Sequence, residues 1–260
     1  MSIINSKNIR VGIWTAVAVG ALIALKFGLH VAGFEFLAVN TLFSSAIGGA
    51  VFIVGFLLAG IIADYKEAEK VPAELRASLE NIVEEGRVFR LTKHEFDEKK
   101  MQASATEVVS NFFRGLSHEG NHSNLQPCLR SIDLLSDSFL EMEKLGMPPN
   151  YVTRLKTEQG NLRRIVLRVY HMQRTQFIPS AHFLAMSLVG LVILLMLFIK
   201  TEGTPESTVI FAVISYLFLY LARLIQIIEK PFREGHQSQD DVSIFLLHEF
   251  EEKLRSQTRR

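Results

Sequence analysis

Two phenylalanines, Phe52 and Phe56, lie one helical turn apart in an apolar run without a charged residue, residues 36–63. The run is also rich in small residues, which let membrane helices approach closely; these are Ser44, Ser45, Gly48, Gly49, Gly55 and Gly60. A ring of phenyl groups around an axis can form a hydrophobic constriction that closes by dewetting. Phenyl edges also carry a partial positive charge that suits a passing anion. The run therefore predicts a pore-lining helix with its gate at Gly48, Gly49, Phe52 and Phe56. In the alternative interpretation, both phenylalanines face lipid or neighbouring helices.

Four apolar runs would position this helix in a membrane. A span needs about 20 mostly apolar residues, and the candidates are residues 11–34, 36–63, 183–199 (extended from about 177) and 207–228. The first run is too long for a signal peptide and a second run follows at once, so a retained span is predicted. Short connections at 33–35 and 200–206 make each pair a helical hairpin.

The predicted fold class is an all-α integral membrane protein with four transmembrane helices, in which a helical domain is inserted between helices 2 and 3. The predicted segments are a first transmembrane hairpin (1–63), a central helical domain (64–176), a second hairpin (177–228) and a tail (229–260). Lysine and arginine flank the spans on the side of the termini and the central domain. The opposite side offers only Lys26 and Lys200. The positive-inside rule therefore predicts that both termini and the central domain are cytoplasmic.

Apolar stripes with helical spacing run through the central segment and the tail. The central stripes include Leu75, Leu79, Ile82 and Val83; Val109, Phe112, Phe113 and Leu116; Ile132, Leu135, Phe139 and Met142; and Leu162, Ile165, Val166 and Val169. Pro72 suits a first helical turn, and residues 120–123 and 146–150 are the clearest breaks. The tail stripe at Val242, Leu246, Phe250 and Leu254 predicts a helix that docks on its own bundle or on a neighbouring subunit, with the neighbour preferred.

The charged residues in or near the spans have competing interpretations. Lys26 could attract anions at the outer mouth or extend its ammonium to the interface. For Arg223 a structural ion pair is predicted, with Glu229 or with an acid of residues 64–69. His182 is expected at the membrane interface. The basic set Arg163, Arg164, Arg168 and Arg174 could line a vestibule, attract anionic lipid or satisfy the positive-inside bias.

Several classes of function receive no support from the sequence. Net charge is only +1, which gives no indication of a nucleic-acid partner. Cys128 is the only cysteine, so an intrachain disulfide and a cysteine-rich metal site are excluded. His118 and His122 are four residues apart but flank Gly120, which disfavours a helical two-histidine site. No enzyme, catalytic residue, metal or cofactor is predicted.

Two short passages resemble a known family. Residues 63–75, Ala-Asp-Tyr-Lys-Glu-Ala-Glu-Lys-Val-Pro-Ala-Glu-Leu, resemble the segment after the second span in the bacterial bestrophin-like membrane proteins, a family of unknown function. Residues 228–232, Ile-Glu-Lys-Pro-Phe, are similar to the Asn-Pro-Phe-type segment after the last span of bestrophins. The order of two spans, helical insert, two spans and tail matches over nearly the whole chain.

The resemblance implies a pentameric, anion-selective (chloride-type) channel in the bacterial inner membrane, with its pore neck lined by the second span. The implied partners are other copies of the chain, membrane lipid and small anions. The stripe Gly49, Ile53 and Leu57 fits the family's pore position as well as Phe52 and Phe56 do. The family's calcium-binding acidic cluster is reduced here, because Arg233 and His236 interrupt the few acids of residues 233–241.

Two rivals to the channel remain at the level of sequence. A non-conducting membrane scaffold or sensor would use the helical domain to recruit a cytoplasmic partner, and the small residues would only pack subunits. A solvent-accessible stripe on the second span would favour the channel over this scaffold. A secondary transporter is disfavoured because the spans lack charges near mid-membrane and lack proline-interrupted halves.

Overall fold

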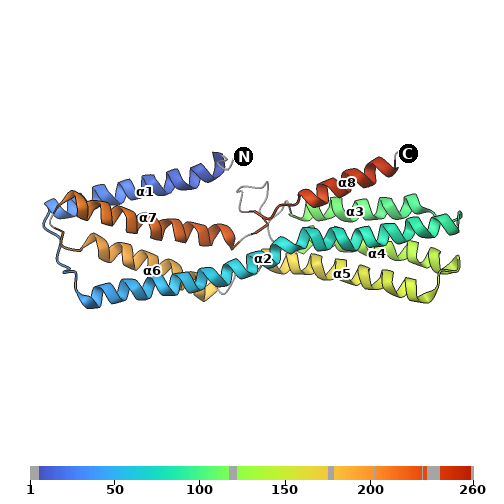
Figure 1. Cartoon of the computed structure of the whole chain (residues 1–260), viewed down its shortest axis with the longest axis horizontal. Helices are drawn as coiled ribbons and strands as arrows, with labels where there is room; N and C mark the ends of the chain where they lie inside the picture. Colours follow the sequence, from blue (N-terminus) through green and yellow to red (C-terminus); the bar gives the residue numbers. More distant parts are fainter. Residues whose placement is uncertain are drawn as a thin grey trace. The chain divides into compact units, whose positions relative to one another are not determined.

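The computed structural model describes residues 6–116, 122–174, 179–201, 203–229, 231–232 and 241–258. Within these ranges the chain forms eight α-helices and no extended strand (Figure 1). The helices are α1 (Ser6–Val31), α2 (Thr41–Thr92), α3 (Glu98–Leu116), α4 (His122–Lys144), α5 (Pro149–Arg174), α6 (Pro179–Leu197), α7 (Pro205–Ile228) and α8 (Phe245–Thr258). They divide into two compact units, and α2 contributes its first part to one and its second part to the other.

The first unit contains α1, the beginning of α2, α6 and α7 (Figure 1). Its core includes Val54, Ala185 and Phe218, each at most 1% exposed. Four helices of the structure are long and apolar enough to cross a membrane, and they are α1, α2, α6 and α7. Each predicted span overlaps one of these helices, although α2 begins at Thr41 and not at residue 36.

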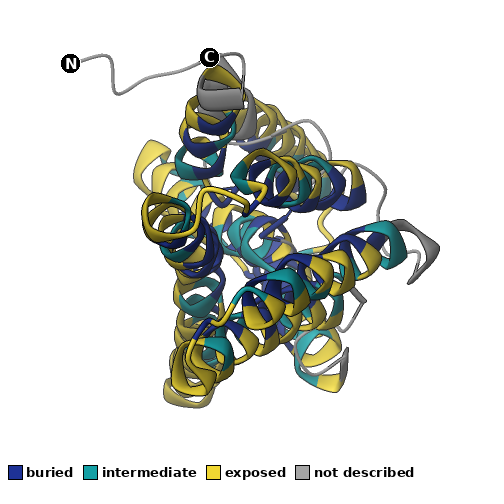
Figure 2. Ribbon diagram, turned by 90° about the vertical axis from the view of Figure 1, so that its right-hand side faces the viewer, coloured by how far each residue is buried: buried dark blue, intermediate teal, exposed yellow. Residues whose placement is uncertain are grey.

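The second unit contains the rest of α2 together with α3, α4, α5 and α8. The predicted stripes of the central segment form its core: Leu75, Ile132 and Leu162 are fully buried, and nearly all the other stripe residues are buried with them. The helices carry buried residues on one side and exposed residues on the other (Figure 2), and the buried sides contain the apolar stripes. Gly86 of α2 allows a close approach of α3, because a Cβ atom there would lie only 2.3 Å from the Met101 sulfur.

One predicted helix start in this unit is wrong. Pro72 lies inside α2, which continues from Thr41 to Thr92. A proline inside a helix loses one backbone hydrogen bond and crowds the preceding turn. Its neighbours Ala68, Val71 and Leu75 are fully buried, so packing on this face compensates for the disturbed turn. The predicted break near residue 146 is present, since Gly146 has φ of 91° and α5 begins at Pro149.

Helix α8 docks on its own chain, in contrast to the preferred prediction that it docks on a neighbouring subunit. Leu247, Phe250 and Leu254 are buried at 1% exposure or less. His248 stacks on Phe113 of α3 with ring centroids 4.3 Å apart. Arg76 of α2 donates to the Leu246 carbonyl at 3.2 Å and to Glu249 at 3.2 Å, and Lys253 pairs with Glu80 at 3.4 Å.

This docking predicts a difference between two phenylalanines of α8. Phe250→Ala removes a buried ring, which typically costs about 3–5 kcal/mol, whereas Phe245 is 55% exposed. We expect limited proteolysis to cut the tail of the Phe250→Ala variant much faster than that of wild type. The matched control Phe245→Ala should keep the wild-type rate. Equal rates in all three proteins would contradict the docking.

Candidate functional site

The first part of α2 packs one side into its unit and leaves the other side uncovered. Ala50, Val54 and Ile61 lie in the core of the unit. Phe52 and Phe56 lie on the uncovered side and are 74% and 71% exposed. Gly48 and Gly49 are exposed with them, so the structure brings the four predicted gate residues to one uncovered side of the helix.

The glycines on this side have no packing role within the chain. A Cβ atom added at Gly48, Gly49 or Gly55 would meet no other atom within 4 Å, apart from the helix itself. Glycine inside a helix costs about 1 kcal/mol relative to alanine. Contacts within the described part of the chain therefore do not explain why three glycines occur here.

The alternative pore stripe, Gly49, Ile53 and Leu57, is partly oriented toward the core of the unit. Leu57 is only partly exposed and packs against the core of the unit, and Ile53 is 36% exposed. Of the two stripes considered from the sequence, that of Phe52 and Phe56 is the one the chain leaves uncovered along its whole length.

Lys26 is the centre of a polar cluster at the hairpin connections. It is 8% exposed, and its ammonium pairs with a Glu35 carboxylate oxygen at 2.6 Å. The same ammonium donates to the Leu197 carbonyl at 3.1 Å and to the Ile199 carbonyl. These carbonyls lie at and just beyond the end of α6, where a helix leaves acceptors without an internal partner. Lys26 therefore ties α1 to the end of α6.

Glu35 extends this cluster to the connection between α6 and α7. Its carboxylate accepts from the Thr201 backbone N–H and hydroxyl, each at 3.0 Å, and lies 3.0 Å from His30 Nδ1. Burial raises the pKa of this carboxyl, but hydrogen bonds from Lys26, Thr201 and His30 outweigh burial and lower it from 4.5 to about 2. The carboxylate stays ionised at neutral pH and fixes both connections.

Backbone contacts join the same two connections. Leu37 and Ile199 form an isolated parallel β-bridge, and the Lys200 N–H donates to the Leu37 carbonyl at 2.7 Å. Phe36 and Phe198 rings lie 5.3 Å apart. The two hairpins are thus connected by backbone, ionic and aromatic contacts at this end of the unit.

These contacts change the interpretation of Lys26. An ammonium that is buried and paired with a carboxylate contributes little to the potential of a pore mouth. The structure therefore does not support the anion-attracting role considered for Lys26 and gives the residue a structural role instead. Sequence reasoning missed Glu35, although an acid nine residues after a lysine across a short hairpin connection is a signal for such a pair.

Arg223 is predicted to pair with Glu229 or with an acid of residues 64–69, but neither pair is found among the residues that the structure describes. Arg223 donates to Gln226 at 3.1 Å. Glu229 binds His182 Nδ1 at 2.7 Å, and its side chain is only 5% exposed. The physical reason is helical geometry, because residues six apart on a helix point about 120° away from each other. His182 lies in the first turn of α6 and Glu229 directly follows the end of α7, so the antiparallel hairpin brings them together.

Two residues of the predicted basic set form ion pairs. Arg163 pairs with Asp133, and Arg168 pairs with Glu67 at 2.5 Å, so both stabilise packing between helices of the second unit. The tail stretch 233–240 lies outside the described residues. Among the residues that are described, no group of three or more His, Cys, Asp or Glu side chains could hold a metal ion.

The pKa of Glu35 predicts a specific pH dependence. Because its pKa is lowered in the folded state, Glu35 stabilises the fold fully above about pH 4.5 and loses this contribution as the pH falls toward 2. Thermal unfolding of Glu35→Gln should lose part of the wild-type slope in that range. The control Glu206→Gln removes an exposed acid without an ion-pair partner among the described residues, and it should keep the slope. A wild-type slope in Glu35→Gln would contradict this role.

The buried pair itself can be tested by removing its cation. Lys26→Met leaves Glu35 buried without its ammonium partner, which typically costs about 3–5 kcal/mol. The double variant Lys26→Met/Glu35→Gln should recover part of this loss in denaturant unfolding. If Lys26→Met alone were as stable as wild type, the pair would have no structural importance.

Comparison with solved structures identifies the fold. No protein-family model matches the chain, and a comparison with curated proteins found no match. Among solved structures, a variant of a bacterial bestrophin homologue from Klebsiella pneumoniae has a TM-score of 0.79 at 13% identity, covering 99% of this chain and 100% of that chain. Another variant of that protein has a TM-score of 0.75 at 14% identity, covering 98% and 100%. A structure described as a membrane protein has a TM-score of 0.76 at 14% identity, with the same coverage.

The similarity extends over the whole chain, including both hairpins and the helical insert. The resemblance predicted from residues 63–75 and 228–232 is thereby confirmed at the level of the fold, and the chain is a membrane protein with a bestrophin-like fold.

Proposed function

We propose that the chain forms a homo-oligomeric channel, a pentamer, that conducts small anions such as chloride through a central pore lined by α2. The observation that carries this proposal is the uncovered face of α2. It combines exposed small residues with two exposed phenylalanines and has no charged residue between Thr41 and Ala63.

The other spans also expose bulky apolar residues, and α1 exposes Gly20 and Gly28 beside them. Exposed residues of α1 include Trp14, Val17 and Phe27, and those of α6 and α7 include Phe183, Leu194 and Val213. Such bulky apolar side chains suit contact with lipid tails. The glycines and serines on the uncovered face of α2 suit close contact with copies of the same helix around an axis. The run of exposed small residues on an uncharged span, together with the two phenylalanines, supports α2 as the helix nearest the axis.

Phe52 and Phe56 are the proposed gate. Phenyl rings from several subunits would narrow the pore and expel water from it, which opposes ion passage until the rings move apart. Because ring edges are partially positive, a narrow passage lined by them favours anions over cations. Selection in this proposal needs no charged residue within the span.

The proposed location is the bacterial inner membrane, with both termini and the second unit in the cytoplasm. The distribution of Lys and Arg around the spans supports this orientation. In that arrangement the helical unit would form a cytoplasmic vestibule continuous with the pore and would hold the subunits together.

Chloride flux from liposomes tests the gate directly. Phe52→Ala and Phe56→Ala shorten the side chains at the constriction, so we expect a severalfold rise in flux over wild type, measured with a chloride-sensitive dye. Phe183→Ala is the matched control, because Phe183 is 73% exposed but lies on α6. Its flux should equal that of wild type.

Two outcomes would contradict the channel. No flux in any variant, with the oligomer intact by light scattering, would favour the non-conducting scaffold that recruits a cytoplasmic partner. An equal rise in Phe183→Ala would show that loosened packing causes the leak, and the gate would not be at Phe52 and Phe56.

A further inference from the structure

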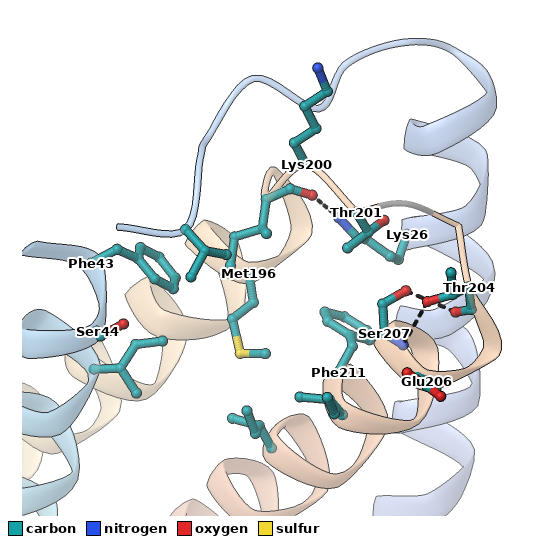
Figure 3. A pocket seen from close by; sticks show the side chains of 15 residues that line it. Lys26, Phe43, Ser44, Met196, Lys200, Thr201, Thr204, Glu206, Ser207 and Phe211 are labelled. Carbon is teal, nitrogen blue, oxygen red and sulfur yellow. Dashed lines mark hydrogen bonds between the residues drawn. The ribbon is translucent and has the colours of Figure 1, made fainter. Parts of the chain in front are cut away.

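A cavity of about 600 Å³ lies in the first unit, on the side of α2 that carries Phe43 and Ile47. Met196 of α6 and Phe211 and Ile214 of α7 form its other apolar walls (Figure 3). Cavities of 300–1,000 Å³ with mainly apolar linings are typical of small-molecule sites. The cavity is partly open to the outside of the unit, so a ligand could enter it from the surrounding membrane.

The lining changes from apolar to polar along the helices. Ile214 marks the apolar end on α7, and Ser207 and Thr204 mark the polar end, where α7 begins. Ser207 and Ile214 are seven residues apart, so this gradient extends over about 10 Å of helix. The polar end belongs to the hairpin connection at the end of the span, which is the depth at which lipid headgroups lie. The gradient therefore matches that of a lipid that stands parallel to the helices.

Two charges of opposite sign lie at the polar end. Lys200 is exposed and extends away from the cavity at its rim (Figure 3). Glu206 lies in the first turn of α7 and is exposed as well. Neither has an ion-pair partner in the part of the chain that the structure describes, whereas Lys26 beside them is already paired with Glu35. One cation and one anion at this rim complement a headgroup that carries both charges.

We infer that this cavity binds one acyl chain of a zwitterionic phospholipid with a primary-amine headgroup. The chain would lie between Phe43, Met196 and Ile214. The headgroup would lie outside the cavity at its rim, where the phosphate would interact with Lys200 and the ammonium with Glu206. This site lies away from the proposed gate and holds whether or not the pore conducts.

Native mass spectrometry of the intact oligomer tests the site, with protein reconstituted in equal amounts of phosphatidylethanolamine and phosphatidylglycerol. We expect wild type to retain phosphatidylethanolamine preferentially. Ile214→Trp fills the apolar end and displaces two or three methylene groups, which corresponds to about a tenfold or greater loss of affinity. Val213→Trp is the matched control, because Val213 is 61% exposed and is not part of the cavity lining.

A headgroup variant separates the two parts of the site. Glu206→Gln should abolish the preference between the two lipids without removing retained lipid, since the acyl cavity is unchanged. Thermal unfolding shows whether each variant is folded. The inference is overturned if wild type retains no lipid, if it shows no preference, or if Val213→Trp loses lipid as Ile214→Trp does. A change of oligomeric state in Ile214→Trp with lipid retention intact would overturn it too, because a neighbouring subunit would then fill the cavity.

Discussion

The buried ion pair between Lys26 and Glu35 is the contact on which the first unit depends. Apolar helices in a membrane gain little from burying apolar surface against each other, because lipid tails are equally apolar. Polar contacts at the ends of the hairpins can therefore decide how the hairpins are held. Lys26 satisfies carbonyls at the end of α6, and Glu35 binds Thr201 beyond it, so one ion pair joins α1, both connections and α6.

This cluster also fixes the start of α2, which begins six residues after Glu35 at Thr41. From there one side of α2 packs in the core of the unit through Ala50 and Val54. The side that carries Phe52 and Phe56 is exposed and is available for contacts outside the chain. A helix held at its start and along one side can present its other side in a fixed register. That is a requirement for any ring of identical residues around a symmetry axis.

The sequence predicts the features that depend on periodicity and misses those that depend on distant pairs. Spans and stripes such as Leu75, Leu79 and Ile82 follow from apolar spacing along one helix, so they could be predicted. The His182–Glu229 pair and the docking of α8 join residues far apart in the chain, and no local pattern encodes them. The prediction from Pro72 is wrong because proline is usual at a helix start, whereas here packing of the face that carries Ala68, Val71 and Leu75 keeps one helix continuous.

The cavity and the proposed gate lie on opposite sides of the same helix. Phe43 and Phe52 are nine residues apart on α2, as are Ile47 and Phe56, and nine residues correspond to a rotation of about 180°. Opening a ring of phenyl groups requires α2 to move away from the axis or to rotate, and either movement carries Phe43 and Ile47 toward the cavity. An empty cavity leaves room for that movement, and a bound acyl chain removes it. If both proposals hold, a lipid bound on the Phe43 and Ile47 side of α2 therefore opposes opening of the gate on its Phe52 and Phe56 side.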